Sequence, residues 1–237
     1  MEQLPELTMP MRKSSFASYL DNALHHPDAT PDEVIQFCDQ ADQCKIATVF
    51  INPVFVALAK KQLADSVVRV GSVAGFPLGA FPTDTKLFEA KNSLENGADE
   101  IDMVIQVGML KAGEYSFIFD EIQKMSEMVH SHDGLLKVIL EVCLLDRFEK
   151  IMGSLISKAA GADFVKTSTG FSTGGAVVED IDLMRRVVGP KMGVKAAGGI
   201  HTLEDTLSMI NAGADRIGTR LAVEILLEYQ KSGDQQP

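Results

Sequence analysis

The sequence predicts a single (β/α)8 barrel, and three observations lead to that fold class. Short β-rich segments alternate eight times with longer segments of helical periodicity along the 237 residues. This length fits one such barrel, which typically runs to about 250 residues. The triplet Gly-Ala-Asp recurs at 97–99, 161–163 and 213–215, each time between an expected helix and an expected strand. An open doubly wound sheet remains the alternative, because periodicity does not reveal closure.

The expected elements follow one another in strict alternation. The strands are short, β-rich runs, and in order they are Tyr19–Ala23, Ile46–Asn52, Val67–Ala74, Glu100–Gln106, Leu135–Val142, Asp163–Thr167, Gly193–Ala196 and Arg216–Thr219. The helices have 3.6-residue periodicity, several begin with a capping residue or a first-turn proline, and the glycine of each repeated triplet ends one of them. In order they are Thr30–Gln43, Pro53–Ala64, Thr83–Asn96, Tyr115–His130, Asp146–Ala160, Val178–Val188, Thr202–Ala212 and Arg220–Lys231.

We expect one barrel domain over 1–237, because no glycine- or serine-rich linker and no shift in composition divides the chain. Residues 1–18 are expected to form an N-terminal extension and residues 232–237 a disordered tail. The first residues lack the apolar core of a secretory signal, and no run of 18 apolar residues indicates a membrane span.

The composition excludes several classes of protein. Hydrophobic residues make up 46% of the chain, which excludes a disordered protein. The 33 acidic residues outnumber the 22 basic ones, so the net charge of −11 argues against a nucleic-acid-binding surface. The three cysteines are odd in number and lack metal-ligand spacing. We therefore expect a soluble protein of the cytoplasm.

Charged residues lie on the expected strands, where a barrel has its interior. Alternation along 100–105 places Asp102 on the face opposite its apolar neighbours. Lys137, Lys166 and Lys195 are 29 residues apart in both intervals, which predicts positions on successive strands. An ion pair or a strand-end lysine that reaches solvent explains any one of these residues alone. Their convergence favours an active site, which this fold builds at the C-terminal ends of its strands.

Clustered lysines have a chemical use. A free lysine, with a pKa of about 10.4, is protonated at neutral pH and cannot attack a carbonyl. Cationic neighbours and partial desolvation favour the neutral amine, and lowering such a pKa by about 3 units takes about 4 kcal/mol of differential interaction. A neutral amine that attacks a carbonyl, with a carboxylate nearby for proton transfer, is what an enzyme needs to form a Schiff base.

Five segments resemble the deoxyribose-phosphate aldolase family and occur in its order. They are GFPLGA at 75–80, ADEIDMV at 98–104, LKVILE at 136–141, FVKTSTGF at 164–171 and VKAAGGI at 194–200. The resemblance implies a class I aldolase that reversibly cleaves 2-deoxy-D-ribose 5-phosphate to D-glyceraldehyde 3-phosphate and acetaldehyde, in deoxyribonucleotide catabolism. It also implies that no dissociable cofactor is needed and that the partners are a small sugar phosphate and a second copy of the chain in a homodimer.

The resemblance also implies residue roles. Lys166 would form the imine, Lys195 would favour the neutral form of that amine, and Asp102 would relay protons through water. Phosphate would bind at bare backbone near the ends of the last strands, where glycine lets an anion approach closely. The expected substrate-binding residues are Asp21, Lys137, Thr169, Gly170, Gly198, Gly199 and Arg220.

The chain departs from the family pattern at several positions. Residues 21–24 read Asp-Asn-Ala-Leu where the family has Asp-His-Thr, so Ala23 lacks a hydroxyl. Val142 stands where a threonine is usual, and 218–221 reads Gly-Thr-Arg-Leu in place of a serine-rich phosphate turn. Arg220 there either grips phosphate bidentately or closes the pocket by its bulk. The C-terminal tyrosine of the family is absent.

These departures leave two other hypotheses open. The first is a Schiff-base aldolase with a different aldehyde or sugar-phosphate substrate, and the second is a weakly catalytic barrel that acts as a binding protein. No metal site is expected, because His25 and His26 are interpreted as a solvated loop pair, and His130 and His132 as residues that cap carbonyls at a helix end. No nucleotide-binding glycine motif occurs.

Overall fold

The computed structural model describes residues 16–233 and shows eight parallel strands closed into a barrel. Neighbouring strands pair in chain order, and pairing of β1 with β8 closes the barrel. The prediction of a (β/α)8 barrel is therefore confirmed, and the open sheet is excluded. The strands are β1 (Leu20–Leu24), β2 (Thr48–Ile51), β3 (Arg69–Ala74), β4 (Glu100–Val104), β5 (Leu135–Ile139), β6 (Phe164–Lys166), β7 (Gly193–Ala197) and β8 (Arg216–Thr219).

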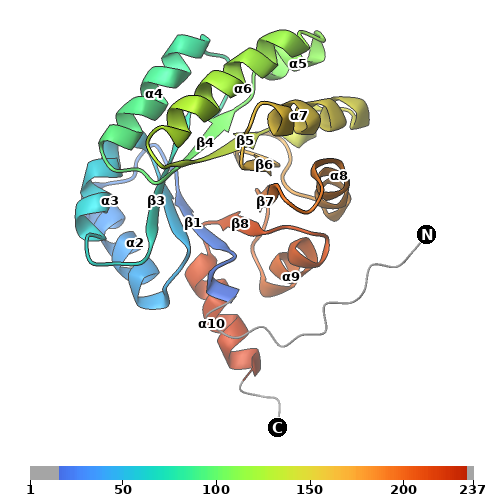
Figure 1. The fold of residues 1–237 in the computed structure, drawn as a ribbon. Coiled ribbons are helices and arrows are strands. Elements are labelled where there is room, and N and C mark those ends of the chain that lie inside the picture. Colours follow the sequence, from blue (N-terminus) through green and yellow to red (C-terminus); the bar gives the residue numbers. More distant parts are fainter. Residues whose placement is uncertain (1–15, 234–237) are drawn as a thin grey trace.

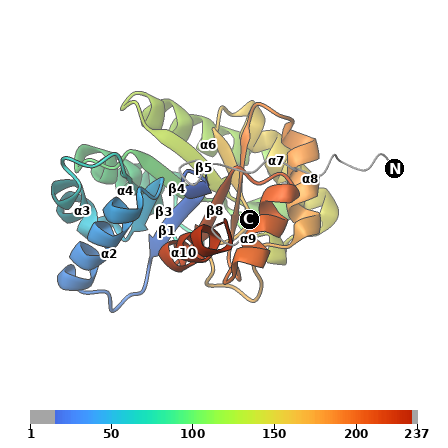
Figure 2. The same cartoon turned by 90° about the horizontal axis from the view of Figure 1, so that it is seen from below.

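Helices surround the strands on the outside, as Figures 1 and 2 show from two directions. The α-helices are α2 (Pro31–Cys44), α3 (Val56–Gln62), α4 (Thr83–Glu95), α5 (Val107–Lys111), α6 (Tyr115–His130), α7 (Arg147–Ala159), α8 (Val178–Val188), α9 (Leu203–Asn211) and α10 (Ala222–Gly233). Two 3₁₀ turns are η1 (Pro53–Phe55) and η2 (Val142–Leu144). Each expected helix is present, whereas α5 and η2 lie in segments where none was expected.

Some element boundaries differ from the prediction. The strand expected to continue to Val142 ends at Ile139, because Glu141 takes a left-handed backbone conformation with φ of 57° and the chain then turns into η2. Residues 1–15 and 234–237, which hold most of the expected extension and tail, lie outside the described residues. Phe16 is fully buried, so the barrel domain begins before Tyr19.

The repeated Gly-Ala-Asp triplet ties each of three strands to its predecessor. The carboxylates of Asp99, Asp163 and Asp215 accept backbone N–H bonds of 2.8–2.9 Å from the start of the preceding strand. Each carboxylate also contacts a basic side chain of a helix, and these contacts are Lys60 with Asp99, His130 with Asp163 and Arg185 with Asp215. The triplet therefore sets strand register as well as ending a helix, and the aspartate's part in this was not foreseen.

Glycines on two strands make room for aromatic rings in the barrel interior. A Cβ at Gly71 would lie 2.4 Å from the ring of Phe50, and one at Gly193 would lie 2.1 Å from the ring of Phe164. Such distances are impossible for real atoms, so these rings can enter the interior only where the neighbouring strand has no side chain. The ring of Phe50 then forms part of the floor beneath the site described below.

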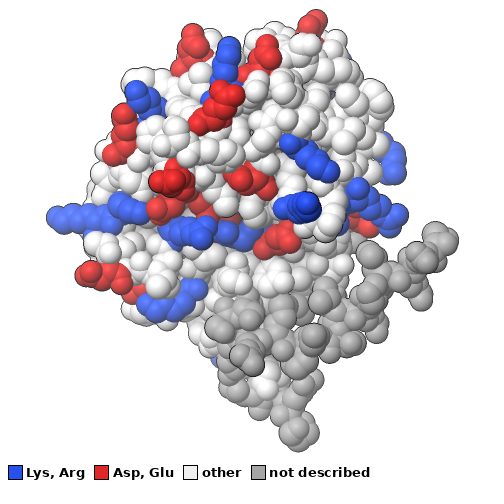
Figure 3. All heavy atoms as spheres, in the orientation of Figure 1, with Lys and Arg blue, Asp and Glu red and all other residues white. Residues whose placement is uncertain are grey.

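The surface carries charges of both signs. On the face seen in Figure 3, acidic and basic side chains are interspersed. Among residues 16–233, no helix has both the length and the apolar character needed to cross a membrane.

Candidate active site

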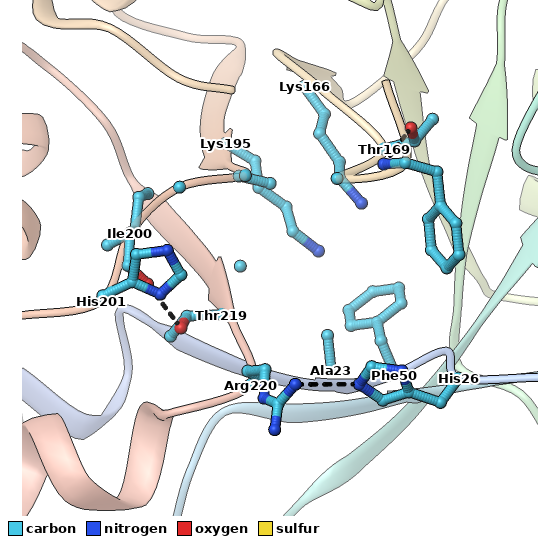
Figure 4. Close-up of a pocket in the computed structure, with 16 residues that line it drawn as sticks. Ala23, His26, Phe50, Lys166, Thr169, Lys195, Ile200, His201, Thr219 and Arg220 are labelled. Carbon is cyan, nitrogen blue, oxygen red and sulfur yellow. Dashed lines mark hydrogen bonds between the residues drawn. The ribbon is translucent and has the colours of Figure 1, made fainter. Parts of the chain in front are cut away.

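A cavity of about 290 Å³ opens at the C-terminal ends of the strands (Figure 4). Strands β6 and β7 contribute the side chains of Lys166 and Lys195, and the loops that follow β6, β7 and β8 supply most of the remaining wall. Of the residues predicted to form the site, the cavity is lined by Lys166, Lys195, Thr169, Gly170, Gly198, Gly199 and Arg220.

The two lysines of the cavity share one carboxylate oxygen. Lys166 and Lys195 are register partners on adjacent strands, which places their side chains at the same level of the barrel. Asp102 Oδ2 lies 2.8 Å from Lys166 Nζ and 2.9 Å from Lys195 Nζ. Lys166 is 4% exposed and Asp102 is fully buried, so the lysine stands between the carboxylate and the cavity. The predicted grouping of these three residues is therefore what the structure shows.

The other predicted charged residues lie one layer deeper. Lys137 is fully buried, contacts the Glu100 carboxylate and lies 3.3 Å from Asp102 Oδ1. Asp21, also fully buried, lies 2.6 Å from Lys195 Nζ and contacts Arg216. Neither residue lines the cavity, so direct substrate contact, which was expected of both, does not fit their positions. Lys137 and Asp21 lie beneath the cavity, where Lys137 contacts Asp102 and Asp21 contacts Lys195.

This interior cluster holds one more positive than negative group when all are ionised. Its cations are Lys137, Lys166, Lys195 and Arg216, and its carboxylates are Asp21, Glu100 and Asp102. An excess positive charge in a low-dielectric interior is relieved most readily when a lysine releases its proton.

Among the cations of the cluster, Lys195 has a lowered pKa, whereas burial of Lys137 is outweighed by the carboxylates around it, which raise the pKa of that lysine. Burial, aided by the charges of Lys166 and Lys137 against those of Asp102 and Asp21, lowers the pKa of Lys195 to about 8. Burial alone would raise the pKa of Asp102, but three lysines outweigh it and hold that pKa well below its usual range. Asp102 is therefore an ionised carboxylate throughout the neutral range.

Phe50 packs against the ammonium groups from the floor of the cavity. Lys195 Nζ lies 3.6 Å from the ring centroid, and Lys137 Nζ and Lys166 Nζ lie 4.5 and 5.9 Å from it. A ring face attracts cations and excludes water. Phe50 was not predicted as a site residue, because an aromatic residue on a strand is ordinarily part of the core.

The site is completed by the loop after β6 and by Gly170, Gly198 and Gly199, which line the cavity and are called the glycine wall below. Gly198 has φ of +86°, and a Cβ there would approach Gly175 Cα to 3.0 Å, so the wall requires glycine. Thr169 faces the cavity, but its N–H and hydroxyl both donate to the Glu141 carboxylate, which anchors the loop after Lys166. Glu141 is 3% exposed, and its left-handed backbone aims the carboxylate at this loop.

Thr219 and Arg220, at the end of β8, line one side of the cavity. The Thr219 hydroxyl donates to the Ile200 carbonyl over 2.8 Å, which holds the β8 end against the loop after β7 (Figure 4). Arg220 is exposed and turned toward His26, so it lines the cavity and does not close it.

Two histidines of the rim were missed, and a third was misinterpreted. His26 and His201 both line the cavity, whereas His25 has both ring nitrogens enclosed. Burial, and then the charge of Lys166, lowers the pKa of His25 to about 3, so its imidazole is neutral. The reading of His25 and His26 as a solvated pair is therefore wrong for His25. The sequence feature that could have identified His25 and His26 is their position just after 21–23, where the chain departs from the family pattern.

Glu100 and Arg216 are the other interior residues that sequence reasoning missed. Glu100 lies two residues before Asp102 on the same strand face, so the alternation that identified Asp102 applied equally to it. Arg216 begins β8 and reaches Asp21 across the barrel closure. Within the described part of the chain, no group of three or more His, Cys, Asp or Glu side chains is placed to hold a metal ion.

Comparisons with known proteins agree over most of the chain. A family model described as DeoC/LacD family aldolase matches residues 16–223. A deoxyribose-phosphate aldolase from Thermococcus gammatolerans is 52% identical over 212 residues, which cover 89% of this chain and 94% of that relative. A deoxyribose-phosphate aldolase from Thermotoga maritima is 49% identical over 221 residues, which cover 92% of this chain and 88% of that relative. A solved deoxyribose phosphate aldolase from Aeropyrum pernix, described as tetrameric, matches with a TM-score of 0.86 at 33% identity and covers 93% of each chain.

Proposed function

Because the chain belongs to the DeoC/LacD family of aldolases, we propose that it reversibly cleaves 2-deoxy-D-ribose 5-phosphate into D-glyceraldehyde 3-phosphate and acetaldehyde. It is a carbon–carbon lyase of the class I type, which uses a lysine imine. The observation that carries this proposal is the shared carboxylate of Asp102 between Lys166 and Lys195, at the base of a cavity open to solvent.

Lys166 is the proposed nucleophile because its amine has the greater access to the cavity. Its Nζ attacks the aldehyde carbon C1 of the open-chain sugar, and loss of water from the carbinolamine leaves a protonated imine. The C2–C3 bond then breaks as the C3 hydroxyl releases its proton, and the electron pair flows into the imine nitrogen. The enamine takes up a proton at C2, and hydrolysis returns acetaldehyde and the free amine. Asp102, reached through water or through the lysines, is the proposed proton relay.

Lys195 has a separate task in this scheme. When protonated, it places a positive charge beside Lys166 and competes with it for Asp102 Oδ2. Both effects favour a neutral Lys166 amine when the substrate arrives. The pKa of Lys195, lowered to about 8 by burial and neighbouring cations, also makes it the second candidate for the imine. Its exposure of 1%, against 4% for Lys166, argues against that role.

Phosphate is proposed to bind at the wall formed by Gly170, Gly198, Gly199 and Arg220. Glycine lets an anion approach backbone closely, and the guanidinium offers a paired hydrogen-bond geometry. A site with these elements fits a phosphorylated aldehyde, and it gives no reason to prefer the alternative substrates or the binding-protein hypothesis.

Trapping with borohydride tests the nucleophile. Incubation with acetaldehyde and borohydride should leave one stable ethyl adduct on Lys166, located by peptide mass spectrometry. The adduct should disappear in Lys166→Met and persist in Lys45→Met, which alters an exposed lysine whose side chain is 60% exposed. An adduct on Lys195 in the wild type would assign the imine to that residue, and no adduct at either position would overturn the mechanism.

A direct assay tests the substrate. Retro-aldol turnover of 2-deoxy-D-ribose 5-phosphate should exceed turnover of other phosphorylated and unphosphorylated sugars in a panel. Faster turnover of another sugar phosphate would favour the first alternative, and binding without turnover would favour the second. A homodimer and a cytoplasmic location are parts of the proposal that rest on the family resemblance and on three free cysteines.

A further inference from the structure

An exposed histidine and an arginine meet at the phosphate end of the cavity. His26 lies in the loop after β1 and Arg220 follows β8, and these loops are neighbours because β1 pairs with β8. Arg220 Nη1 lies 3.1 Å from His26 Nε2 (Figure 4). Both side chains line the same cavity as Lys166 and the glycine wall.

The chemistry of this contact fixes the protonation state of His26. A guanidinium has donors and no acceptor, so Nη1–H donates and the Nε2 lone pair of His26 accepts. The imidazole is therefore neutral in this arrangement, with its proton on Nδ1. If Nε2 gained a proton, this hydrogen bond would be replaced by a contact between two cations.

A phosphate monoester in the cavity would reverse that preference. Its oxygens are better acceptors for Arg220 than an imidazole nitrogen is, and its negative charge favours a protonated His26 beside it. An imidazole is suited to this exchange because it changes charge between about pH 5 and 8.

Other charged groups act on His26 in opposite directions. Arg220 opposes protonation of His26, whereas Glu33 in the first turn of α2 interacts electrostatically with His26 and favours its protonation. Asn52 Nδ2 donates to the His26 carbonyl over 3.1 Å and holds the backbone in place. An arriving anion therefore meets an imidazole whose charge it can change.

We propose that His26 and Arg220 form a proton-linked phosphate clamp, in which binding of a phosphate monoester draws a proton onto His26. The inference rests on the proposed function for the identity of the natural ligand, but its anion chemistry does not require the imine. Affinity for phosphorylated ligands should fall as the pH rises from about 6 to about 8. Reaction with an unphosphorylated aldehyde should not depend on this pair.

Calorimetric titration with glycerol 3-phosphate tests the clamp, because this phosphate monoester has no carbonyl and cannot form an imine. Measurements in buffers of different ionisation enthalpy report proton uptake directly. In the wild type we expect proton uptake near neutral pH and an affinity about tenfold higher at about pH 6 than at about pH 8. A site in which no protein group changes its charge would instead bind more tightly at about pH 8 than at about pH 6, since the phosphate itself becomes a dianion above about pH 6.

Three variants separate the contribution of His26 from others. His26→Gln keeps an acceptor for Arg220 but cannot titrate, so it should lose proton uptake relative to the wild type, whereas His26→Lys should bind well at both pH values. His201 also lines the cavity, and its contribution is common to the wild type and the His26 variants. His132→Gln alters a histidine of the segment before β5, at the opposite end of the barrel, and should behave as the wild type.

Wild-type affinity that does not fall with pH, or proton uptake that persists unchanged in His26→Gln, would overturn the clamp. Circular dichroism and a thermal unfolding midpoint that match the wild type should confirm that His26→Gln is folded. If borohydride trapping fails in the wild type, the proposed function falls, and the glycerol 3-phosphate result still decides the clamp.

Discussion

Replacing Asp102 with asparagine tests whether the interior charges are balanced as the structure indicates. Asn has nearly the same shape, so the change removes a negative charge without opening a cavity. The interior cluster would then hold four cations and two carboxylates, and Lys166 and Lys195 would lose their shared anion. Removing one partner of a buried ion pair costs about 3–5 kcal/mol.

This cost in folding free energy has an upper limit, because a buried lysine can lose its proton and become neutral. A lysine in the variant can release its proton, which at pH 7 costs about 4.6 kcal/mol relative to a pKa of about 10.4 in the unfolded chain. We therefore expect Asp102→Asn to lower the free energy of unfolding by about 3–5 kcal/mol at pH 7. Urea denaturation followed by circular dichroism measures this difference.

The pH dependence of the deficit gives a sharper test. A lysine that is neutral in the folded variant and protonated in the unfolded chain makes stability rise by about 2.7 kcal/mol from pH 7 to pH 9. In the wild type, the pKa of Lys195 is lowered to about 8, so stability is lower below that pH and rises by only about 1.4 kcal/mol over the same range. The deficit should therefore shrink by about 1.4 kcal/mol.

The control is Asp182→Asn, in an exposed pair with Arg186 at 2.9 Å, for which we expect a change below about 0.5 kcal/mol at either pH. A deficit for Asp102→Asn below about 1 kcal/mol, or one that grows between pH 7 and pH 9, would refute the charge-balance reasoning.

Three further predictions follow from other parts of the structure. Gly198→Ala should destabilise the protein by about 1–3 kcal/mol and raise KM for phosphorylated substrate, because φ is +86° and a Cβ would meet Gly175; a normal KM would contradict this. Glu121→Leu should cost about 3–5 kcal/mol in urea denaturation, since it leaves fully buried Lys86 without its carboxylate at 3.0 Å, and a cost under about 1 kcal/mol would show that the pair is dispensable. The kcat for retro-aldol cleavage should fall as the pH rises through about 8, where Lys195 loses its proton and its charge no longer favours a neutral nucleophile; a kcat still rising at about pH 9 would argue against that role.

Much of the fold and part of the site could be predicted from local sequence patterns. Two-residue alternation placed Asp102 on the inner face of its strand, and helical periodicity with capping residues located the helices. The same alternation applies to Glu100, two residues before Asp102 on that strand, although it was not predicted as a site residue. The 29-residue spacing of the lysines correctly assigned them to β5, β6 and β7.

Equal spacing did not mean equal height in the barrel. Lys195 pairs in register with Lys166, but Lys166 pairs with Ile139, so Lys137 lies two residues lower on β5. This stagger between strands directs Lys137 to Glu100 and away from the cavity. The stagger arises from closing the sheet into a tilted barrel, which a pattern within one strand does not encode.

The sequence by itself determined the eight strand–helix units, the inward position of the charged residues and the glycine turns, because each depends on neighbours within a few residues. Only the tertiary structure decided which charges meet. Arg216 reaches Asp21 from 195 positions away, and Arg220 reaches His26 from 194, because β8 closes on β1. Closure and stagger are properties of all eight strands together, and they convert a list of lysines and carboxylates into a paired interior with one excess positive charge beneath an open cavity.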